Sequence, residues 1–332
     1  MNLKHLLAPL TLTLGFSLLT PAIAQVTTDP VGYKTLTIKG GNNLSIIGLE
    51  FLNASDFTGT ASSVTSNTVT SEGVNFDDLL DANKTYFLDL ISGSDAGANT
   101  LILSWSGDTL TLGDDLTSAI VTDTDQFRLH SLPTIGDIFG IGGDVIVGGS
   151  ATTADLILLP NPAGTGLIRI YYSTGGFTGI GWRQVGSSGD KSNLPIYFTD
   201  GLYVLKKSAG DSQIVVSGSV KVTPTKVIIE DGYLPYSTIF PSATTLFNSG
   251  LYDSNNLASS ITAGSATTAD LVFTDTDGDG ILERYYYSSG GFSGTGWRQV
   301  GASGDKSDVT LSSSFAVFNQ NGPVLVSRQP AY

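Results

Sequence analysis

Apolar and polar residues alternate along much of this chain, at the spacing of β-strands. The alternation is clearest in four segments: Thr35–Lys39, Thr100–Trp105, Thr109–Leu112 and Gln213–Ser217. Because successive side chains of a strand point to opposite faces, each segment would present one apolar face and one polar face. Glycine, asparagine and aspartate, which favour tight turns, interrupt these segments. The pattern predicts an all-β fold of sandwich or barrel type, with a helix expected only near 76–81.

One block of the sequence occurs twice. Residues 151–192 align without a gap with residues 266–307, an offset of 266 − 151 = 115, and 26 of the 42 aligned positions are identical. The identical stretches of the first copy include Ala151-Thr-Thr-Ala-Asp-Leu156, Tyr171-Tyr-Ser173, Gly181-Trp-Arg-Gln-Val-Gly186 and Gly189-Asp-Lys-Ser192. A duplication of this length predicts two tandem β-sandwich or barrel-like modules.

Weaker matches indicate that the first copy is interrupted. Ser45-Ile46 resembles Ser237–Ile239, yet 106 residues separate Ser45 from Ala151 whereas 29 separate Ser237 from Ala266. The difference, 106 − 29 = 77 residues, is the size of a small inserted unit. The predicted division is a signal peptide at 1–24, β module A at 25–51 and 129–220, an inserted small β-barrel at 52–128, and β module B at 221–332.

The first residues have the pattern of a secretory signal peptide. Lys4 and His5 precede the apolar run Leu6–Thr20, and Ala22-Ile-Ala24 offers a cleavage site. No later segment is long and apolar enough for a transmembrane helix. We therefore expect export through the secretory pathway to the periplasm, the cell surface or the extracellular space.

The amino-acid composition excludes several kinds of catalytic and metal site and disfavours some classes of partner. The chain has no cysteine, and its one methionine is Met1, so thiolate metal centres and cysteine nucleophiles are excluded. The mature chain keeps one histidine, His130, which we interpret as a strand residue rather than a catalytic base. The net charge of −14 disfavours nucleic acids and anionic membranes, and it leaves carboxylates available for Ca²⁺.

Several segments resemble a known group of proteins. They are Asp29-Pro-Val-Gly-Tyr33, Leu36-Thr-Ile38, Ser45-Ile46, Phe57-Thr-Gly-Thr60, Ser63-Val64, Asn67-Thr-Val-Thr70 and the repeated Tyr-Tyr-Ser…Gly-Trp-Arg block. Together they resemble a family of secreted bacterial β-rich proteins whose activity is uncharacterised. The resemblance implies export and β structure, and it transfers no functional residue.

A candidate calcium loop lies in module B. Asp275, Asp277 and Asp279 occupy positions 1, 3 and 5 of a turn, Gly280 allows the sharp bend, and Glu283 can close the site at position 9. The segment departs from the EF-hand pattern at position 12, where Tyr286 replaces the bidentate glutamate. The aligned turn of module A has no carboxylate, so the alternative is a solvated acidic turn.

The second candidate site is a duplicated aromatic cluster. Tyr171, Tyr172, Phe177 and Trp182 recur as Tyr286, Tyr287, Phe292 and Trp297, and Arg183 and Arg298 follow the tryptophans. Aromatic rings on a β surface can stack on sugars, and an adjacent arginine can bind an acidic sugar. The alternative is that the tryptophans anchor the core and the arginines pin a loop. The candidate ligand-binding residues are Tyr172, Trp182, Arg183, Tyr287, Trp297 and Arg298.

No catalytic constellation is recognisable, so we expect a non-catalytic secreted β-rich structural, surface or adhesion protein without a required cofactor. The first alternative is a carbohydrate-binding module that uses the paired aromatics, with polysaccharide or other cell-surface components as partners. Further alternatives are an outer-membrane β-barrel and a carboxylate-based hydrolase, because paired carboxylates need no local signature.

Overall fold

The computed structural model describes residues 29–141, 145–162 and 166–330, and the predicted signal peptide lies outside these residues. The chain is 43% strand and 5% helix, which confirms the all-β class. The described residues contain two short α-helices, α1 (Phe76–Leu79) and α2 (Ile135–Phe139), and α1 lies in the segment where the sequence favoured a helix. Among the described residues, no helix has the length and apolar character needed to cross a membrane.

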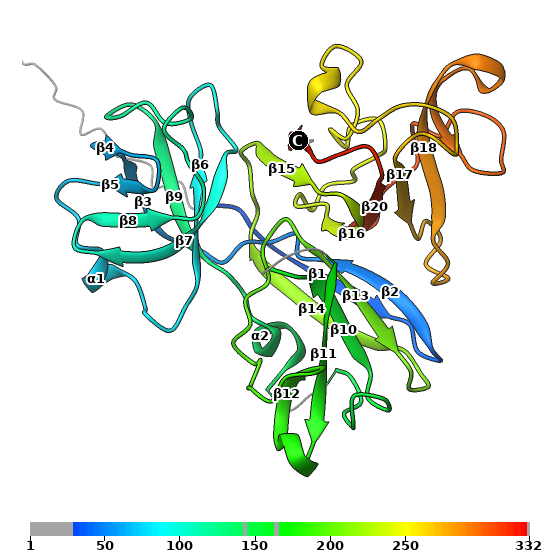
Figure 1. The fold of residues 1–332 in the computed structure, drawn as a ribbon, viewed down its shortest axis with the longest axis horizontal. Coiled ribbons are helices and arrows are strands. Elements are labelled where there is room, and N and C mark those ends of the chain that lie inside the picture. Colours follow the sequence, from blue (N-terminus) through cyan, green and yellow to red (C-terminus); the bar gives the residue numbers. More distant parts are fainter. Residues whose placement is uncertain (1–28, 142–144, 163–165, 331–332) are drawn as a thin grey trace, which may run out of the picture.

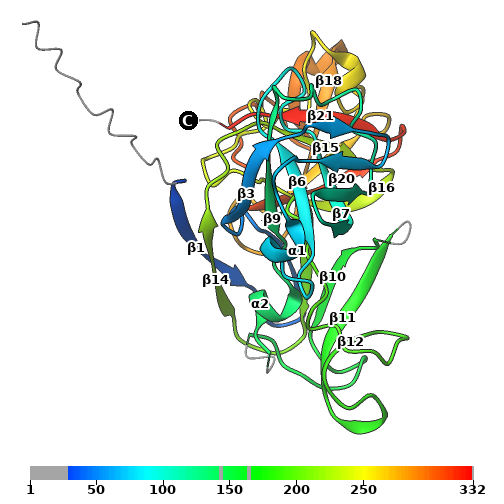
Figure 2. The same cartoon turned by 90° about the vertical axis from the view of Figure 1, so that its left-hand side faces the viewer.

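Module A is assembled from two separate parts of the chain. Its strands are β1 (Val31–Ile38), β2 (Asn43–Gly48), β10 (Leu156–Pro160), β11 (Leu167–Thr174), β12 (Ile180–Gln184), β13 (Gly201–Lys206) and β14 (Ser212–Ser219). They form a five-stranded antiparallel sheet in the order β12-β11-β10-β13-β2 (Figure 1). Strands β1 and β14 form a separate pair (Figure 2). Leu36 and Ile214 of the pair share a core with Ile157, Trp182 and Leu202 of the larger sheet, which makes module A a sandwich.

Module B repeats this arrangement without interruption. Its strands are β15 (Thr225–Ile229), β16 (Gly232–Ser237), β17 (Leu271–Thr274), β18 (Glu283–Ser289), β19 (Thr295–Gln299), β20 (Ser314–Asn319) and β21 (Val324–Arg328). The sheet order β16-β20-β17-β18-β19 and the pair β15-β21 follow the same connectivity as module A. Val227, Val272, Trp297, Phe315 and Val326 lie in its core.

The segment between β2 and α2 forms a sheet of its own. Its strands are β3 (Ser55–Thr60), β4 (Ser63–Val64), β5 (Thr68–Thr70), β6 (Tyr86–Leu90), β7 (Asn99–Ser106), β8 (Thr109–Leu112) and β9 (Gln126–Ser131). They pair in the order β3-β9-β6-β7-β8-β5-β4, so the end strands β3 and β4 are not neighbours. The sheet is a curled half-barrel, in the segment where the sequence predicted a small β-barrel (Figure 1). Because β9 continues to Ser131, residues 129–131 belong to this sheet and not to module A.

Buried polar and aromatic contacts join the three units. Thr238 of module B donates a hydrogen bond to Glu50 of module A, with 2.7 Å between the two oxygens. Phe87 of the inserted unit stacks on Phe198 of module A, with 4.4 Å between the ring centroids. Burial of these contacts fixes the units against one another, and the inserted unit lies beside both modules (Figure 1).

Candidate functional site

The two hairpins that carry the duplicated aromatic cluster have the same local geometry. Each bends through a 3₁₀ turn, η1 (Gly176–Thr178) between β11 and β12, and η3 (Gly291–Ser293) between β18 and β19. Gly176 and Gly291 have φ of 81° and 75°, a left-handed conformation that favours glycine. We refer to 175–179 and 290–294 as the aromatic loops. The repeated sequence thus gives the repeated backbone that two equivalent sites require.

Both tryptophans of the cluster are buried. Trp182 is 0% exposed and Trp297 is 2% exposed. The indole nitrogen of Trp182 donates to the carbonyl oxygen of Gly140 at 2.8 Å, and the ring contacts Tyr172 edge-on at 5.4 Å between centroids. Since a sugar can stack only on an exposed ring face, Trp182 and Trp297 anchor the cores and cannot serve as the stacking platform that the paired-aromatic hypothesis required.

The two candidate tyrosines are half-buried. Tyr172 lies opposite Trp182 on neighbouring strands, and Tyr287 lies opposite Trp297 in the same register. Tyr287 is further covered by Tyr252, whose ring stacks on it at 3.6 Å between centroids. These contacts place both tyrosines at the edge of their cores and leave little of the Tyr287 ring face for a ligand.

The two arginines brace their hairpins. Arg183 Nη1 donates to Asp190 Oδ1 at 3.0 Å, and Arg298 Nη1 donates to Asp305 Oδ1 at 2.9 Å. In each copy Nη1 also reaches the carbonyl oxygen of the preceding tryptophan, and Nη2 reaches a carbonyl oxygen at the start of the strand. Hydrogen bonds from Ser192 and the charge of Arg183 lower the pKa of Asp190. The guanidinium donors are thus engaged in holding the loops, which agrees with the alternative that the arginines pin them.

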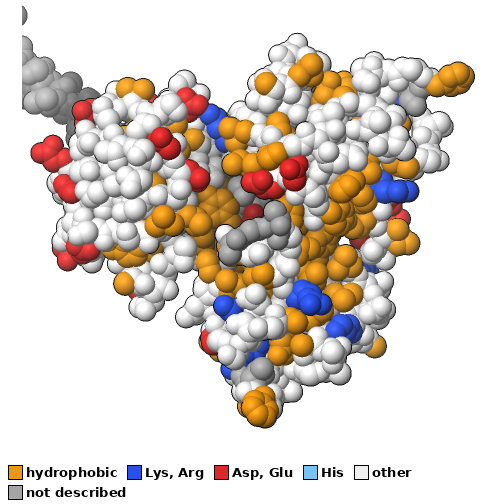
Figure 3. All heavy atoms as spheres, viewed as in Figure 1, with side chains coloured by type: hydrophobic (Ala, Val, Ile, Leu, Met, Phe, Trp, Pro, Cys, Tyr) orange, Lys and Arg blue, Asp and Glu red, His pale blue; other side chains and the backbone are white. Residues whose placement is uncertain are grey.

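The exposed aromatic residue of each loop is its phenylalanine. Phe177 has a relative exposure of 111% and Phe292 of 113%, the highest among the exposed large apolar side chains. In the space-filling view, hydrophobic side chains stand at the outer ends of the β11–β12 and β18–β19 hairpins (Figure 3). Glycines flank both phenylalanines, and this pattern is the sequence signal that marks them as tips of turns. Two identical apolar contacts are thus presented to solvent at separate ends of the molecule.

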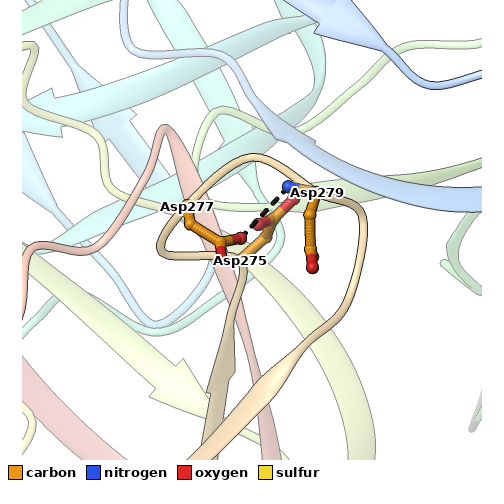
Figure 4. A group of neighbouring side chains, drawn as sticks. All are labelled: Asp275, Asp277 and Asp279. Carbon is orange, nitrogen blue, oxygen red and sulfur yellow. Dashed lines mark hydrogen bonds between the residues drawn. The ribbon is translucent and has the colours of Figure 1, made fainter.

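The aspartate loop between β17 and β18 brings three carboxylates together. One oxygen each of Asp275, Asp277 and Asp279 lies within 4.8 Å of the others (Figure 4). Asp275 accepts hydrogen bonds from the backbone nitrogens of Gly278 and Gly280, at 2.7 and 2.9 Å. These bonds wrap the loop around the carboxylates, an arrangement of hard oxygen ligands that suits Ca²⁺.

Glu283, the fourth predicted ligand, closes the same loop. Its Oε2 accepts a hydrogen bond from the backbone nitrogen of Thr276 at 3.2 Å. In module A the corresponding turn closes with the backbone nitrogen of Asn161 donating to the carbonyl oxygen of Gly166 at 3.0 Å. The hairpin therefore forms with or without carboxylates, and the turn carries aspartates in module B but not in module A.

His130 lies in β9 and is 2% exposed. Its Nδ1 is 2.8 Å from the carbonyl oxygen of Asn53, its ring stacks on Phe87 at 5.4 Å between centroids, and burial lowers its pKa. These contacts describe a neutral core histidine. Comparison of the chain with family models, with curated proteins and with solved structures finds no match.

Proposed function

We propose that this protein is exported and acts as a non-catalytic binding or adhesion component, whose two modules hold one repetitive extracellular polymer through the aromatic loops. The observation that carries the proposal is the full exposure of Phe177 and Phe292 at equivalent positions. An exposed phenylalanine keeps its apolar surface in water, which is unfavourable. A partner that covers the ring removes this surface from water and so gains binding free energy.

The loops are preorganised for such a contact. Arg183 and Arg298 each join the strand that follows the loop to an aspartate seven residues further on. A rigid loop loses little conformational entropy when its tip is covered, which favours binding. Two equal sites on one rigid molecule also bind a repeating ligand with avidity, because the second contact forms at a high effective concentration.

A polysaccharide is the polymer that this arrangement fits best. Its sugar units repeat, and their apolar faces pack on aromatic rings. The net charge of −14 further favours a neutral polymer over a polyanion.

The test is binding of the mature full chain to immobilised neutral polysaccharides. Phe177→Ala and Phe292→Ala should each weaken binding by about tenfold or more through loss of avidity, and the double variant should lose it. Phe247→Ala is the matched control, since Phe247 is 75% exposed but lies outside both loops. A double variant that binds as tightly as the wild type would overturn the proposal.

A second candidate function is Ca²⁺ binding at the aspartate loop. It is favoured by the convergence of three carboxylate oxygens within 4.8 Å. Asp275 and Gly278 also line a groove between the modules together with Lys34 and Lys39 of module A. A bound ion would rigidify module B where it meets module A, which is a structural rather than a catalytic role.

A further inference from the structure

A cleft lies where the inserted unit, module A and module B meet. Its volume is about 710 Å³, within the usual range for small-molecule sites. Leu101 and Leu103 of the inserted unit, Tyr197 and Asp200 of module A, and Tyr236 of module B are among its lining residues. Figure 3 shows hydrophobic side chains gathered along the seams between the units. The cleft is separate from the aromatic loops and from the aspartate loop.

Asp200 is the unusual residue of this cleft. It ends a turn in which its backbone nitrogen donates to the carbonyl oxygen of Tyr197 at 3.0 Å, directly before β13. Within the described residues, its carboxylate accepts no hydrogen bond and has no cationic partner, and burial raises its pKa to about 7. Asp200 is half-buried, and a carboxylate without a partner in such surroundings is costly, so a ligand that supplies a positive charge and hydrogen bonds would recover that cost.

The other charged groups of the cleft are mostly acidic. Asp114, Asp115 and Glu230 also line it and are exposed. Lys226 is the one cationic side chain among the described lining residues, and its ammonium group is paired with the carboxylate of Asp95. When Asp200 is ionised, the lining carries four negative carboxylates, and the positive charge of its one lysine is balanced by Asp95. The cleft therefore attracts cations and repels anions.

The remaining walls are apolar and aromatic. The Tyr197 hydroxyl donates to Asn99 Oδ1 at 2.7 Å, and the Tyr236 hydroxyl accepts from the backbone nitrogen of Glu230 at 2.8 Å. Because the Tyr197 hydroxyl donates its proton within the protein, this half-buried tyrosine contributes mainly aromatic surface to a ligand. Leu101, Leu103 and Leu234 add aliphatic surface. A ligand for this cleft thus needs an apolar body as well as a positive charge.

We propose that the cleft at the junction of the three units binds an organic cation, a protonated amine on an aromatic or aliphatic body, with the ammonium group at Asp200 and the apolar body against Tyr197, Leu101 and Leu103. This site is independent of the polymer binding assigned to the aromatic loops. Asp200→Asn should accordingly leave polymer binding unchanged.

The experiment is calorimetric titration of the mature full chain with three probes of similar shape and different charge: phenethylammonium, 2-phenylethanol and 3-phenylpropionate. Only the ammonium probe should bind at pH 8. Asp200→Asn, which keeps the shape of the side chain, should weaken its binding about tenfold or more, as expected for loss of a hydrogen bond to a charged group. Asp308→Asn, at an exposed carboxylate outside the cleft lining, is the matched control and should bind like the wild type.

The wild-type protein provides a second readout that needs no variant. Asp200 must be ionised to hold the ammonium group, so the affinity should fall about tenfold between pH 8 and pH 6. Tyr197, Tyr236, Asp114, Asp115, Glu230 and Lys226 are the other titratable groups of the lining, and their ordinary pKa values lie outside this interval. Equal binding of the alcohol and the ammonium probe, or an affinity that does not change with pH, would overturn the proposal.

Discussion

Asp89 and Lys221 form a buried ion pair that ties the inserted sheet to the segment between the two modules. Asp89 lies in β6 and is 1% exposed, and Lys221 lies between β14 and β15 and is 3% exposed. The Lys221 ammonium also donates to Thr223 Oγ1 at 2.8 Å. Such a pair specifies how the units dock, because either partner alone would leave a buried charge without compensation.

Lys221→Met tests this docking contact. The substitution leaves the Asp89 carboxylate buried and unpaired, so we expect a loss of about 3–5 kcal/mol in the free energy of unfolding. Urea denaturation followed by far-UV circular dichroism measures it. The double variant Asp89→Leu with Lys221→Met should regain most of the loss, since it removes both charges. A single variant as stable as the wild type would contradict a docking role for the pair.

The tryptophan and the phenylalanine of one hairpin should respond oppositely to truncation. Trp182→Ala empties a fully buried site and should cost about 3–5 kcal/mol of unfolding free energy. Phe177→Ala removes a fully exposed ring, and the free energy of unfolding should stay within about 0.5 kcal/mol of the wild type. Thermal or urea denaturation of the two variants side by side distinguishes an anchor from a surface contact. Similar losses in both would show that the phenylalanine packs within the protein.

The stability of the protein should carry a pH-dependent contribution from Asp200. The pKa of this group is raised from 3.8 to about 7 in the folded state, so between these values the folded chain holds a proton that the unfolded chain has released. The contribution is therefore full below about pH 4 and is lost as pH rises to about 7. Asp200→Asn cannot ionise, so its unfolding free energy relative to the wild type should increase by roughly 2–4 kcal/mol from pH 4.5 to pH 7.5.

The measurement is urea denaturation of both proteins at several pH values across this interval, without added ligand. The control is Asp308→Asn, whose stability difference from the wild type should not change over the same interval. A constant difference between Asp200→Asn and the wild type would mean that the Asp200 carboxyl titrates at an ordinary pKa.

Calcium should bind the aspartate loop weakly. Calorimetric titration of the mature chain with Ca²⁺ should give one site with a Kd of about 10⁻⁴–10⁻³ M, as in other extracellular modules. Asp277→Asn removes one charged ligand while keeping an oxygen that can accept the hydrogen bond from the backbone nitrogen of Asp279, so the loop should keep its shape and lose the ion. A flat trace for the wild-type protein would leave a solvated acidic turn as the interpretation.

The sequence predicted the strands and the tandem repeat better than the exact register. The alternating segment Thr35–Lys39 lies in β1 up to Ile38, Gln213–Ser217 lies in β14, and the two strands pair with each other. The weaker match of Ser45 with Ser237 is displaced. Leu202 and Phe315 are the second residues of the equivalent strands β13 and β20. Leu202 lies opposite Ile47, whereas Phe315 lies opposite Tyr236, so Ile47 corresponds to Tyr236. This pairing makes Leu234, and not Ser237, the counterpart of Ser45. Short strands with few identical residues leave such a shift undetected, since the pairing that fixes it is formed with a distant strand.

The sequence could likewise predict a site formed by neighbouring residues, but not one formed by residues that are distant in the chain. The aspartate loop is local in sequence, so spacing alone could bring Asp275, Asp277 and Asp279 together. The junction cleft is not local, because Leu101, Asp200 and Tyr236 meet only when three units dock. The burial of Trp182 was also beyond the sequence, since a tryptophan in a β hairpin is compatible with a core or with a surface.

The inserted unit leaves and re-enters module A at nearly the same point. Asn53 Nδ2 donates to the carbonyl oxygen of Ser131 at 3.0 Å, so the residues that flank the half-barrel are neighbours. An inserted domain whose two ends are neighbours spans no more distance in module A than a short surface loop would. Module A therefore keeps the same strand connectivity as module B despite the insertion. The inserted half-barrel in turn supplies one side of the cleft that lies between the three units.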